Sequence, residues 1–255
     1  MITIKTPEEI EILSEGGKIL ASILDDVSSK VGAGISTKEL DTRAYNLIKK
    51  AGGNPSFLGY KSRDSKTAYP ASLCVSINNE IVHGIPSEDR ILKEGDIVSL
   101  DFGMEYKKLF TDMSITVGVG EISQKASNLI DITKKSLSGG IKSLRGGVFP
   151  EDYGFVVQSI VEKAGFSIIK ELVGHGVGYA VHEDPDIPNY GKKGKGFEFK
   201  EGMVVALEPM ACIGNSDIVL ADDGWTWKTK DGSLSAHFEH TVAIEKDGCR
   251  ILTRQ

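Results

Sequence analysis

The sequence has few of the features that mark disulfide-rich or membrane-spanning proteins. It contains only 3 cysteines in 255 residues and no Cys-x-x-Cys pair, which argues against a disulfide framework and against a structural zinc knuckle. No stretch approaches the roughly 18 consecutive apolar residues that span a bilayer, and the N-terminus has no apolar signal-peptide core. We therefore expect a cytoplasmic protein.

The sequence also lacks a long basic run. Its formal net charge is -6, its isoelectric point is near 5.5, and its acidic and basic residues are well mixed. Such a charge distribution is typical of ordinary solubility and does not attract polyanions. We therefore expect no nucleic-acid partner and no membrane partner.

Interdomain linkers and low-complexity segments are lacking as well. The polar segment from Lys61 to Ala68 (KSRDSKTA) predicts an exposed, mobile loop within a domain. A chain of 255 residues can bury a full core and is at the upper end of what folds as one domain. We expect a single domain over residues 1–255, made of half-units at about 1–120 and 121–255.

A repeated phrase is the most informative feature that the sequence does contain. Lys93 to Phe102 (KEGDIVSLDF) is repeated as Lys200 to Pro209 (KEGMVVALEP). In each copy a Lys-Glu-Gly turn is followed by an apolar run that predicts a buried strand. An acidic residue, Asp101 or Glu208, stands where that strand should still be inside the protein.

A second pair of runs extends the repeat. Phe110 to Val117 (FTDMSITV) aligns with His237 to Ile244 (HFEHTVAI), which places Asp112 opposite Glu239. The pattern therefore indicates a duplication in which each half brings two buried carboxylates to a shared centre. Packed carboxylates repel strongly unless they share protons or bind cations, so a metal site is the natural inference.

Helical periodicity precedes the strands in both halves. Capping residues and glycine stops bound the predicted helices. The pattern indicates an α+β fold in which helices cover one face of a curved sheet and the carboxylates lie on the other face. The predicted helices run from Pro7 to about Ser29, from Ser36 to Gly52, from Ser123 to Leu144 and from Pro150 to Ala164.

Histidines supply the candidate nitrogen ligands. His175 has glycine on both sides, which allows a metal and a substrate backbone to approach, so it is the best candidate. His83 and His182 also stand in turn-rich, apolar contexts. His240 follows Glu239 and should point to the opposite face of its strand, whereas His237 shares the face of Glu239.

These residues together form an oxygen-rich set with one imidazole. Single acidic residues at strand ends are usually turn or surface residues, but their equivalent placement in both halves favours a site. Such ligands suit two divalent first-row metals, namely Mn, Fe, Co or Zn, and a pair of these ions supports hydrolysis. The predicted ligands are Asp101, Asp112, His175, Glu208 and Glu239.

Five ordered motifs give the chain a family resemblance. They are VSLDFG, GHGVG followed by VHEDP, EPM, DGWT and SLSAHFEHT. Over nearly its whole length the sequence resembles type I methionine aminopeptidases, which are pita-bread metallopeptidases. The resemblance implies a pita-bread fold with pseudo-twofold halves and a curved antiparallel sheet. It also implies removal of N-terminal methionine, preferably before a small residue, through a hydroxide that bridges two metal ions.

The resemblance further assigns roles to single residues. It implies that Asp101, Asp112 and Glu239 hold one metal ion. Asp112, His175, Glu208 and Glu239 would hold the other. Glu208 would also shuttle protons, His182 would stabilise the oxyanion or orient the substrate carbonyl, and His83 would contact the amide near the scissile bond.

A pocket for the methionine side chain is implied in the same way. Val181 stands where an aromatic residue often lines that pocket, and the segment from Tyr60 to Tyr69 is longer than usual for the family. The pocket should be narrow and apolar. Its implied substrate-binding residues are Phe57, Tyr60, Tyr69, Cys74, His83, His182 and Trp225.

Two alternatives remain open on the sequence. One is an Xaa-Pro peptidase of the same fold, although these usually carry an additional N-terminal domain. The other is a pita-bread binding protein that has lost catalysis, although every implied ligand position is filled here. The favoured interpretation is a monomeric enzyme that acts on the N-termini of nascent polypeptides, including those at the ribosome.

Overall fold

The computed structural model describes residues 1–61 and 66–254. Its helices begin where the capping residues predict. Thr6 and Ser36 each accept from the backbone N–H three residues on, and Glu9 and Glu39 complete the two capping boxes. The helices in the described part of the chain are α1 (Pro7–Ser28), α2 (Thr37–Lys50), α3 (Gln124–Ile141) and α4 (Pro150–Lys163).

A large antiparallel sheet runs through both halves of the sequence. Its strands follow the order β1-β4-β5-β14-β9-β7-β8, with β2 paired to β4 and β15 paired to β14. Two smaller sheets have the orders β13-β10-β6 and β11-β12-β3. The strands are β1 (Asn54–Pro55), β2 (Cys74–Ile77), β3 (Glu80–Val82), β4 (Ile97–Tyr106), β5 (Leu109–Gly118), β6 (Ser167–Ile168), β7 (Gly174–Gly176), β8 (Glu183–Ile187), β9 (Val204–Leu207), β10 (Met210–Cys212), β11 (Ile218–Leu220), β12 (Trp227–Thr229), β13 (Ser235–His237), β14 (Glu239–Ile244) and β15 (Cys249–Ile251).

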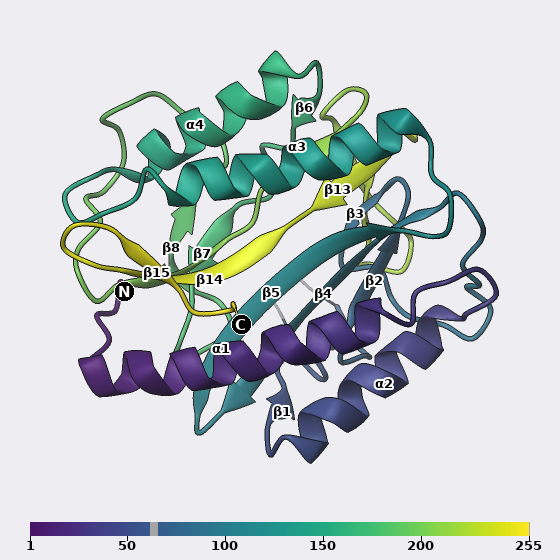
Figure 1. Cartoon of the computed structure of the whole chain (residues 1–255), viewed down its shortest axis with the longest axis horizontal. Helices are drawn as coiled ribbons and strands as arrows, with labels where there is room; N and C mark the ends of the chain where they lie inside the picture. The colour runs from purple at the N-terminus through teal and green to yellow at the C-terminus, as the bar shows by residue number, and fades with distance from the viewer. Residues whose placement is uncertain (62–65, 255) are drawn as a thin grey trace.

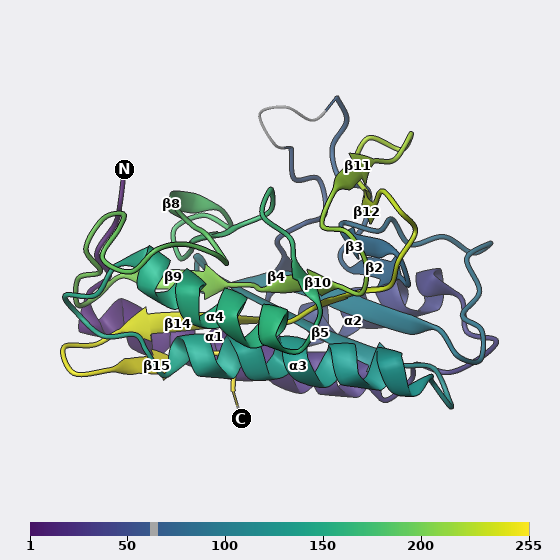
Figure 2. The same ribbon diagram turned by 90° about the horizontal axis from the view of Figure 1, so that it is seen from above.

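The helices cover one face of the large sheet, as the sequence predicts. Figure 2 shows the helices on one side of the strands and the segments β8, β11 and β12 on the other. In the first half α1 packs on β4 and β5, and in the second half α3 and α4 pack on each other beside β13, β6 and β8 (Figure 1). The face away from the helices is therefore free to hold a site.

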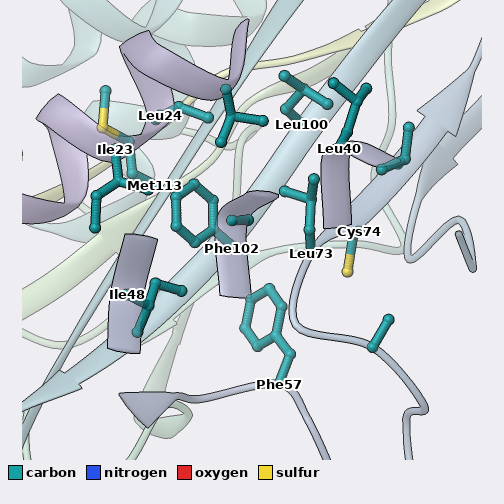
Figure 3. Close-up of a cluster of buried hydrophobic side chains, with 14 of the residues drawn as sticks. Ile23, Leu24, Leu40, Ile48, Phe57, Leu73, Cys74, Leu100, Phe102 and Met113 are labelled. Atoms are coloured by element: carbon teal, nitrogen blue, oxygen red, sulfur yellow. The ribbon is translucent and has the colours of Figure 1, made fainter. Parts of the chain in front are cut away.

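Apolar side chains fill the space between the helices and the sheet. In the first half, Leu24 and Leu40 from the helices meet Leu100 and Phe102 from β4, and all four side chains are buried (Figure 3). Burying a Leu or Phe side chain contributes about 1.5–3 kcal/mol each. This packing fixes β4 and β5, which carry two of the predicted metal ligands.

Two predicted strands differ in extent from what their apolar patterns suggest. Glu208 directly follows β9 instead of lying within it, because Pro209 has no backbone N–H with which to extend the ladder. The run from His237 to Ile244 is divided between β13 and β14 at Phe238. Both acidic residues of this half nevertheless remain buried, Glu208 at 9% and Glu239 at 2% exposure.

A glycine in α1 allows the C-terminal segment to pack against this helix. A Cβ atom at Gly17 would lie 2.5 Å from the carbonyl oxygen of Leu252. We expect Gly17→Ala to lower the free energy of unfolding by about 1–3 kcal/mol through overpacking, although alanine is the better helix former. Urea denaturation would measure this. A Cβ atom at Gly32 meets nothing within 4 Å, so Gly32→Ala is the control, and equal midpoints for both variants would contradict the prediction.

Candidate metal centre

Strand register brings three of the acidic residues onto the same face of the sheet. Asp101 on β4 and Glu239 on β14 both lie directly opposite Ser114, which is on the strand between them, β5. Asp112 is two residues before Ser114 and therefore shares its face. The two halves of the sequence thus meet at β5 and β14, with carboxylates from both sides of the junction.

The remaining predicted ligands join this face through β9. His175 on β7 pairs with Ala206, and Ala206 pairs with Thr241 on β14. Thr241 is two residues from Glu239, so His175 and Glu239 share a face. Glu208, two residues after Ala206, follows at the end of the same strand.

The side chains of these residues converge. Ligand atoms of Asp112, His175 and Glu239 all lie within 4.8 Å of one another. Nε2 of His175 lies 3.4 Å from Oε1 of Glu208. All five predicted ligands, including Asp101, line one cavity of about 110 Å³.

Burial disfavours the charged form of each of these carboxylates and so raises their pKa values. Desolvation raises the pKa of Asp112 to about 7. It also raises the pKa values of Asp101, Glu208 and Glu239 well above their ordinary range, and repulsion from neighbouring carboxylates adds to this effect. Oδ1 of Asp101 is buried without a hydrogen-bond partner. A bound cation would both neutralise the charges and satisfy such an oxygen, so the residues fit a metal site.

The His175 ring is oriented for metal binding. Its Nδ1 lies 2.9 Å from the carbonyl oxygen of Gly176, which can only accept a hydrogen bond, so Nδ1 carries the proton. Nε2 then presents its lone pair to the carboxylates, as in most metal-binding histidines. Burial lowers the pKa of His175 and so favours this neutral form.

Two further histidines lie where strand alternation predicts. Nε2 of His237 is 3.5 Å from Oε2 of Glu208, and Nδ1 is 3.1 Å from Oγ of Ser114. His240 points to the opposite face, where its Nδ1 lies 2.9 Å from Oγ1 of Thr253. His237 is therefore a neighbour of the centre and His240 is not.

Threonine side chains hydrogen-bond β5 to β14 and to β13. Oγ1 of Thr241 accepts from the N–H of Asp112 at 2.9 Å and donates to its carbonyl oxygen at 2.8 Å. Oγ1 of Thr116 makes the same pair of bonds with the backbone of His237, both at 2.8 Å. Sequence reasoning did not identify these threonines, because a buried threonine in a strand has no distinguishing pattern.

An apolar cavity of about 310 Å³ adjoins the carboxylates. Phe57, His83 and His182 line both cavities, so the two spaces share a wall. Aromatic rings pack edge to face along it, with 5.3 Å between the ring centroids of Tyr69 and Trp225. All seven residues predicted to bind substrate line this cavity, together with Leu220, Gly224 and Trp227, which the sequence did not indicate.

His182 stands between the two cavities. Its ring centroid is 4.4 Å from that of His175 and 4.9 Å from that of Tyr60. His182 remains exposed to solvent, but desolvation by the surrounding protein and the neighbouring His175 and His83 rings lower the pKa of its imidazole well below the ordinary value, which favours the neutral form. The adjacent Val181 is 4% exposed and packs in the core cluster that also contains Phe57.

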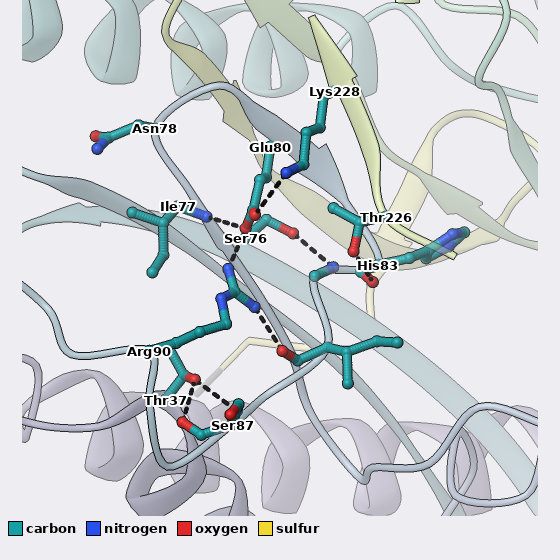
Figure 4. A network of polar contacts seen from close by, with 12 residues as sticks. Thr37, Ser76, Ile77, Asn78, Glu80, His83, Ser87, Arg90, Thr226 and Lys228 are labelled. Carbon is teal, nitrogen blue, oxygen red and sulfur yellow. Dashed lines mark hydrogen bonds and ion pairs between the residues drawn. The ribbon is translucent and has the colours of Figure 1, made fainter. Parts of the chain in front are cut away.

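His83 occupies a strained backbone position. Its φ of 61° lies in the left-handed region, which non-glycine residues rarely adopt and which often marks functional sites. Hydrogen bonds hold the turn: Thr226 Oγ1 donates to the His83 carbonyl at 3.3 Å, and the Gly84 N–H donates to Ser76 Oγ at 3.1 Å (Figure 4). Burial lowers the pKa of His83 to about 4.

The DGWT motif builds the outer wall of the apolar cavity. Oδ1 of Asp223 accepts from the backbone N–H groups of Trp225 and Thr226, both at 2.8 Å. Nε1 of Trp225 donates to Oγ1 of Thr67 at 3.3 Å. Thr67 belongs to the segment predicted to be an exposed, mobile loop, and residues 62–65 of that segment lie outside the described residues.

The sequence matches a known family of metallopeptidases. The profile of metallopeptidase family M24 matches residues 11–246. The chain belongs to metallopeptidase family M24. The M24 chain is 44% identical to methionine aminopeptidase 1 of Bacillus subtilis over 254 residues, which cover 100% of both proteins.

Solved structures of M24 relatives share the fold. The crystal structure of methionine aminopeptidase from Thermotoga maritima has a TM-score of 0.96 at 41% identity, with 100% of both chains covered. The prolidase from Pyrococcus furiosus has a TM-score of 0.77 at 22% identity and is covered over 65% of its length, which shows a common fold alone. The predicted α+β pita-bread fold is therefore confirmed.

Family membership and geometry together indicate that this M24 chain binds divalent metal. A metallopeptidase is a hydrolase whose chemistry needs such an ion, and the buried Asp112, His175 and Glu239 offer ligands of the right kind. In the part of the chain that the structure describes, no helix is long and apolar enough to cross a membrane.

Proposed function

We propose that this chain is a metal-dependent aminopeptidase that hydrolyses the N-terminal methionine from peptides and nascent proteins, preferably when the second residue is small. One observation carries the proposal: an apolar cavity with aromatic walls opens onto the buried carboxylates and shares Phe57, His83 and His182 with them. Full-length relatives at 41–44% identity, which bear the name methionine aminopeptidase, support it.

The carboxylate cavity is proposed to hold two divalent ions, drawn from Co, Mn, Fe and Zn. Asp101, Asp112 and Glu239 would hold one ion, and His175 and Glu208 would join Asp112 and Glu239 around the second. When bound, the ions would polarise the scissile carbonyl and lower the pKa of a water molecule. The orphaned Oδ1 of Asp101 and the free Nε2 of His175 support this ligand set.

The apolar cavity is proposed to select the side chain. Phe57, Tyr60, Tyr69, Cys74 and Trp225 would surround a methionine, whose flexible thioether suits an aromatic-lined space. The free α-amino group would then point toward the carboxylates. Only an N-terminal residue presents a charged amine at that position, so the site would act as an exopeptidase.

Three side chains are proposed to carry out the chemistry. Glu208, with its raised pKa, would take a proton from the attacking water and deliver it to the leaving amine. His182, at the wall between the cavities, would donate a hydrogen bond to the developing oxyanion. His83 would contact the amide near the scissile bond and so hold the peptide in register.

The alternatives have less support. An Xaa-Pro peptidase is represented among the structural neighbours by the Pyrococcus furiosus prolidase, but that likeness is at 22% identity. A non-catalytic binding protein would not need the filled ligand set.

We further propose one catalytic domain over residues 1–255 with half-units at about 1–120 and 121–255. Action as a cytoplasmic monomer and contact with the ribosome stay predictions.

The activity is tested with metal-stripped protein that is resupplied with Mn, Co, Fe or Zn one at a time. Substrates are Met-Ala-Ser, the same peptide with an acetylated N-terminus, and Ala-Pro-Ser. We expect methionine release from the free tripeptide alone, measured by chromatography. Cleavage only before proline would establish the prolidase alternative, and metal binding without any cleavage would establish the binding protein.

Trp225 provides a test of the side-chain cavity. We expect Trp225→Leu to raise KM for Met-Ala-Ser by about tenfold, because part of the apolar wall is lost, with little change in metal affinity. Steady-state kinetics and calorimetric metal titration would measure the two effects. Phe197→Leu is the matched control, because Phe197 is a half-buried aromatic residue that packs on Phe199 and lines neither cavity. A lower metal affinity with unchanged KM would contradict the assignment of the cavity to substrate.

A further inference from the structure

We propose that Lys5 is a positioning residue for His182, acting through an ion pair with Glu183. The role of His182 comes from the proposed function, so the inference rests on that function and deepens it. Lys5 is far from His182 in the sequence, but the N-terminal segment lies beside β8 in both views (Figures 1 and 2). Nothing in the sequence around Lys5 sets it apart from the exposed lysines.

The ion pair is buried. Nζ of Lys5 lies 2.8 Å from Oε2 of Glu183, and the two side chains are 1% and 9% exposed. The backbone of Lys5 is fixed too, because its N–H donates to the carbonyl of Gly202 at 2.8 Å. A lysine is almost never buried to this degree unless it is paired.

Glu183 uses its other oxygen to close the turn that carries His182. Oε1 accepts from the backbone N–H groups of Tyr179 and Ala180, the latter at 3.0 Å. A carboxylate that bonds back to residues three and four positions earlier fixes the intervening backbone, and His182 lies in that interval. The turn also packs directly on the lysine, since a Cβ atom at Gly178 would lie 2.3 Å from Cε of Lys5.

A chain of contacts thus leads from Lys5 to the centre. The ammonium orients the Glu183 carboxylate, the carboxylate holds the turn, and the turn presents the His182 ring to His175 and Tyr60. Neither Lys5 nor Glu183 lines the two cavities described above. Their effect on the reaction is therefore exerted through the position of the ring.

Removing one charge of a buried pair leaves the other without compensation. In Lys5→Met the Glu183 carboxylate would move toward solvent and release the turn. A displacement of about 1 Å at a catalytic group can lower the rate about 100-fold. The pocket aromatics and the metal ligands are not part of the turn, so KM and metal affinity should stay close to their wild-type values.

The test compares Lys5→Met with Glu183→Gln, the double variant and an exposed control, Lys18→Met. We expect Lys5→Met to lower kcat for Met-Ala-Ser by about 100-fold with KM within about threefold. The double variant restores neutrality and keeps an oxygen for the turn, so it should recover at least about tenfold of that loss. A kcat for Lys5→Met within threefold of wild type, or metal affinity that falls together with kcat, overturns the proposal. Glu183→Gln leaves the buried Lys5 ammonium without its charge partner and should also lower kcat, so if Lys5→Met does not fold, an unchanged kcat in Glu183→Gln overturns the proposal.

A second readout does not depend on activity. In the zinc-loaded protein, the imidazole NMR signal of His182, assigned with His182→Gln, should shift in Lys5→Met, whereas the signal of His240 on the opposite face should not. An unshifted His182 signal overturns the proposal. If the wild type releases no methionine but the His182 signal moves, the proposed function fails while the contact between Lys5 and the His182 turn is supported.

Discussion

Replacing Glu208 with glutamine is expected to lower kcat for methionine release by at least about 1,000-fold. General acid–base groups contribute about 100- to 10,000-fold, and a glutamine cannot carry the transferred proton. The substituted side chain keeps one oxygen for a metal ion, so KM should change far less than kcat. Burial and the neighbouring carboxylates raise the pKa of Glu208, which suits a group that must both accept and release a proton.

The repeat itself offers the control for this variant. Glu201 lies in the turn that precedes β9, is exposed, and belongs to the same Lys-Glu-Gly phrase. Glu201→Gln should retain the wild-type kcat. Steady-state kinetics with saturating metal would separate the two, and a Glu208→Gln enzyme that keeps more than about a tenth of the wild-type kcat would exclude proton transfer by Glu208.

Asp112→Asn is expected to abolish activity and to stabilise the metal-free protein at neutral pH. The change removes a predicted ligand of both ions but also removes one charge from the buried carboxylate group. The pKa of Asp112 is raised from 3.8 to about 7 in the folded state. The stability that the protonated form contributes is thus complete below about pH 4 and is lost as the pH rises through 7, by on the order of 4 kcal/mol.

Thermal denaturation of the chelated protein between pH 4 and pH 8 would reveal this effect. The Tm of the wild type should fall across the window, and that of Asp112→Asn should fall less. Asp131→Asn, an exposed change in α3, should follow the wild-type curve. If the Tm of all three proteins fell equally as the pH rose, the prediction that Asp112 is buried in its protonated form would be refuted.

Local sequence signals predicted the helices and the face on which the acidic residues lie. Thr6 and Ser36 bond to the backbone of their own first turns, so a few adjacent residues determine where these helices begin. Strand alternation likewise separated His237 from His240. Alignment of the two copies of the repeat singled out all four acidic residues, because Asp101 matches Glu208 and Asp112 matches Glu239.

Contacts between distant segments could not be predicted in this way. Thr241 bonds to the backbone of Asp112, 129 positions away, and Lys5 bonds to Glu183, 178 positions away. Each bond exists because the sheet places two strands or loops side by side, and neither residue type differs from many exposed ones. The end of β9 before Glu208 was also missed, since the apolar pattern outweighed Pro209.

The junction of β5 and β14 has a consequence for the origin of the chain. Each half supplies two of the four carboxylates, and β5 with Asp112 and β14 with Glu239 run antiparallel across the junction. An ancestor of half the length would have presented an incomplete ligand set on an open sheet edge. Two copies related by a twofold axis would cover that edge and complete the set. Fusion of two such copies would turn a homodimer interface into the centre of a single chain.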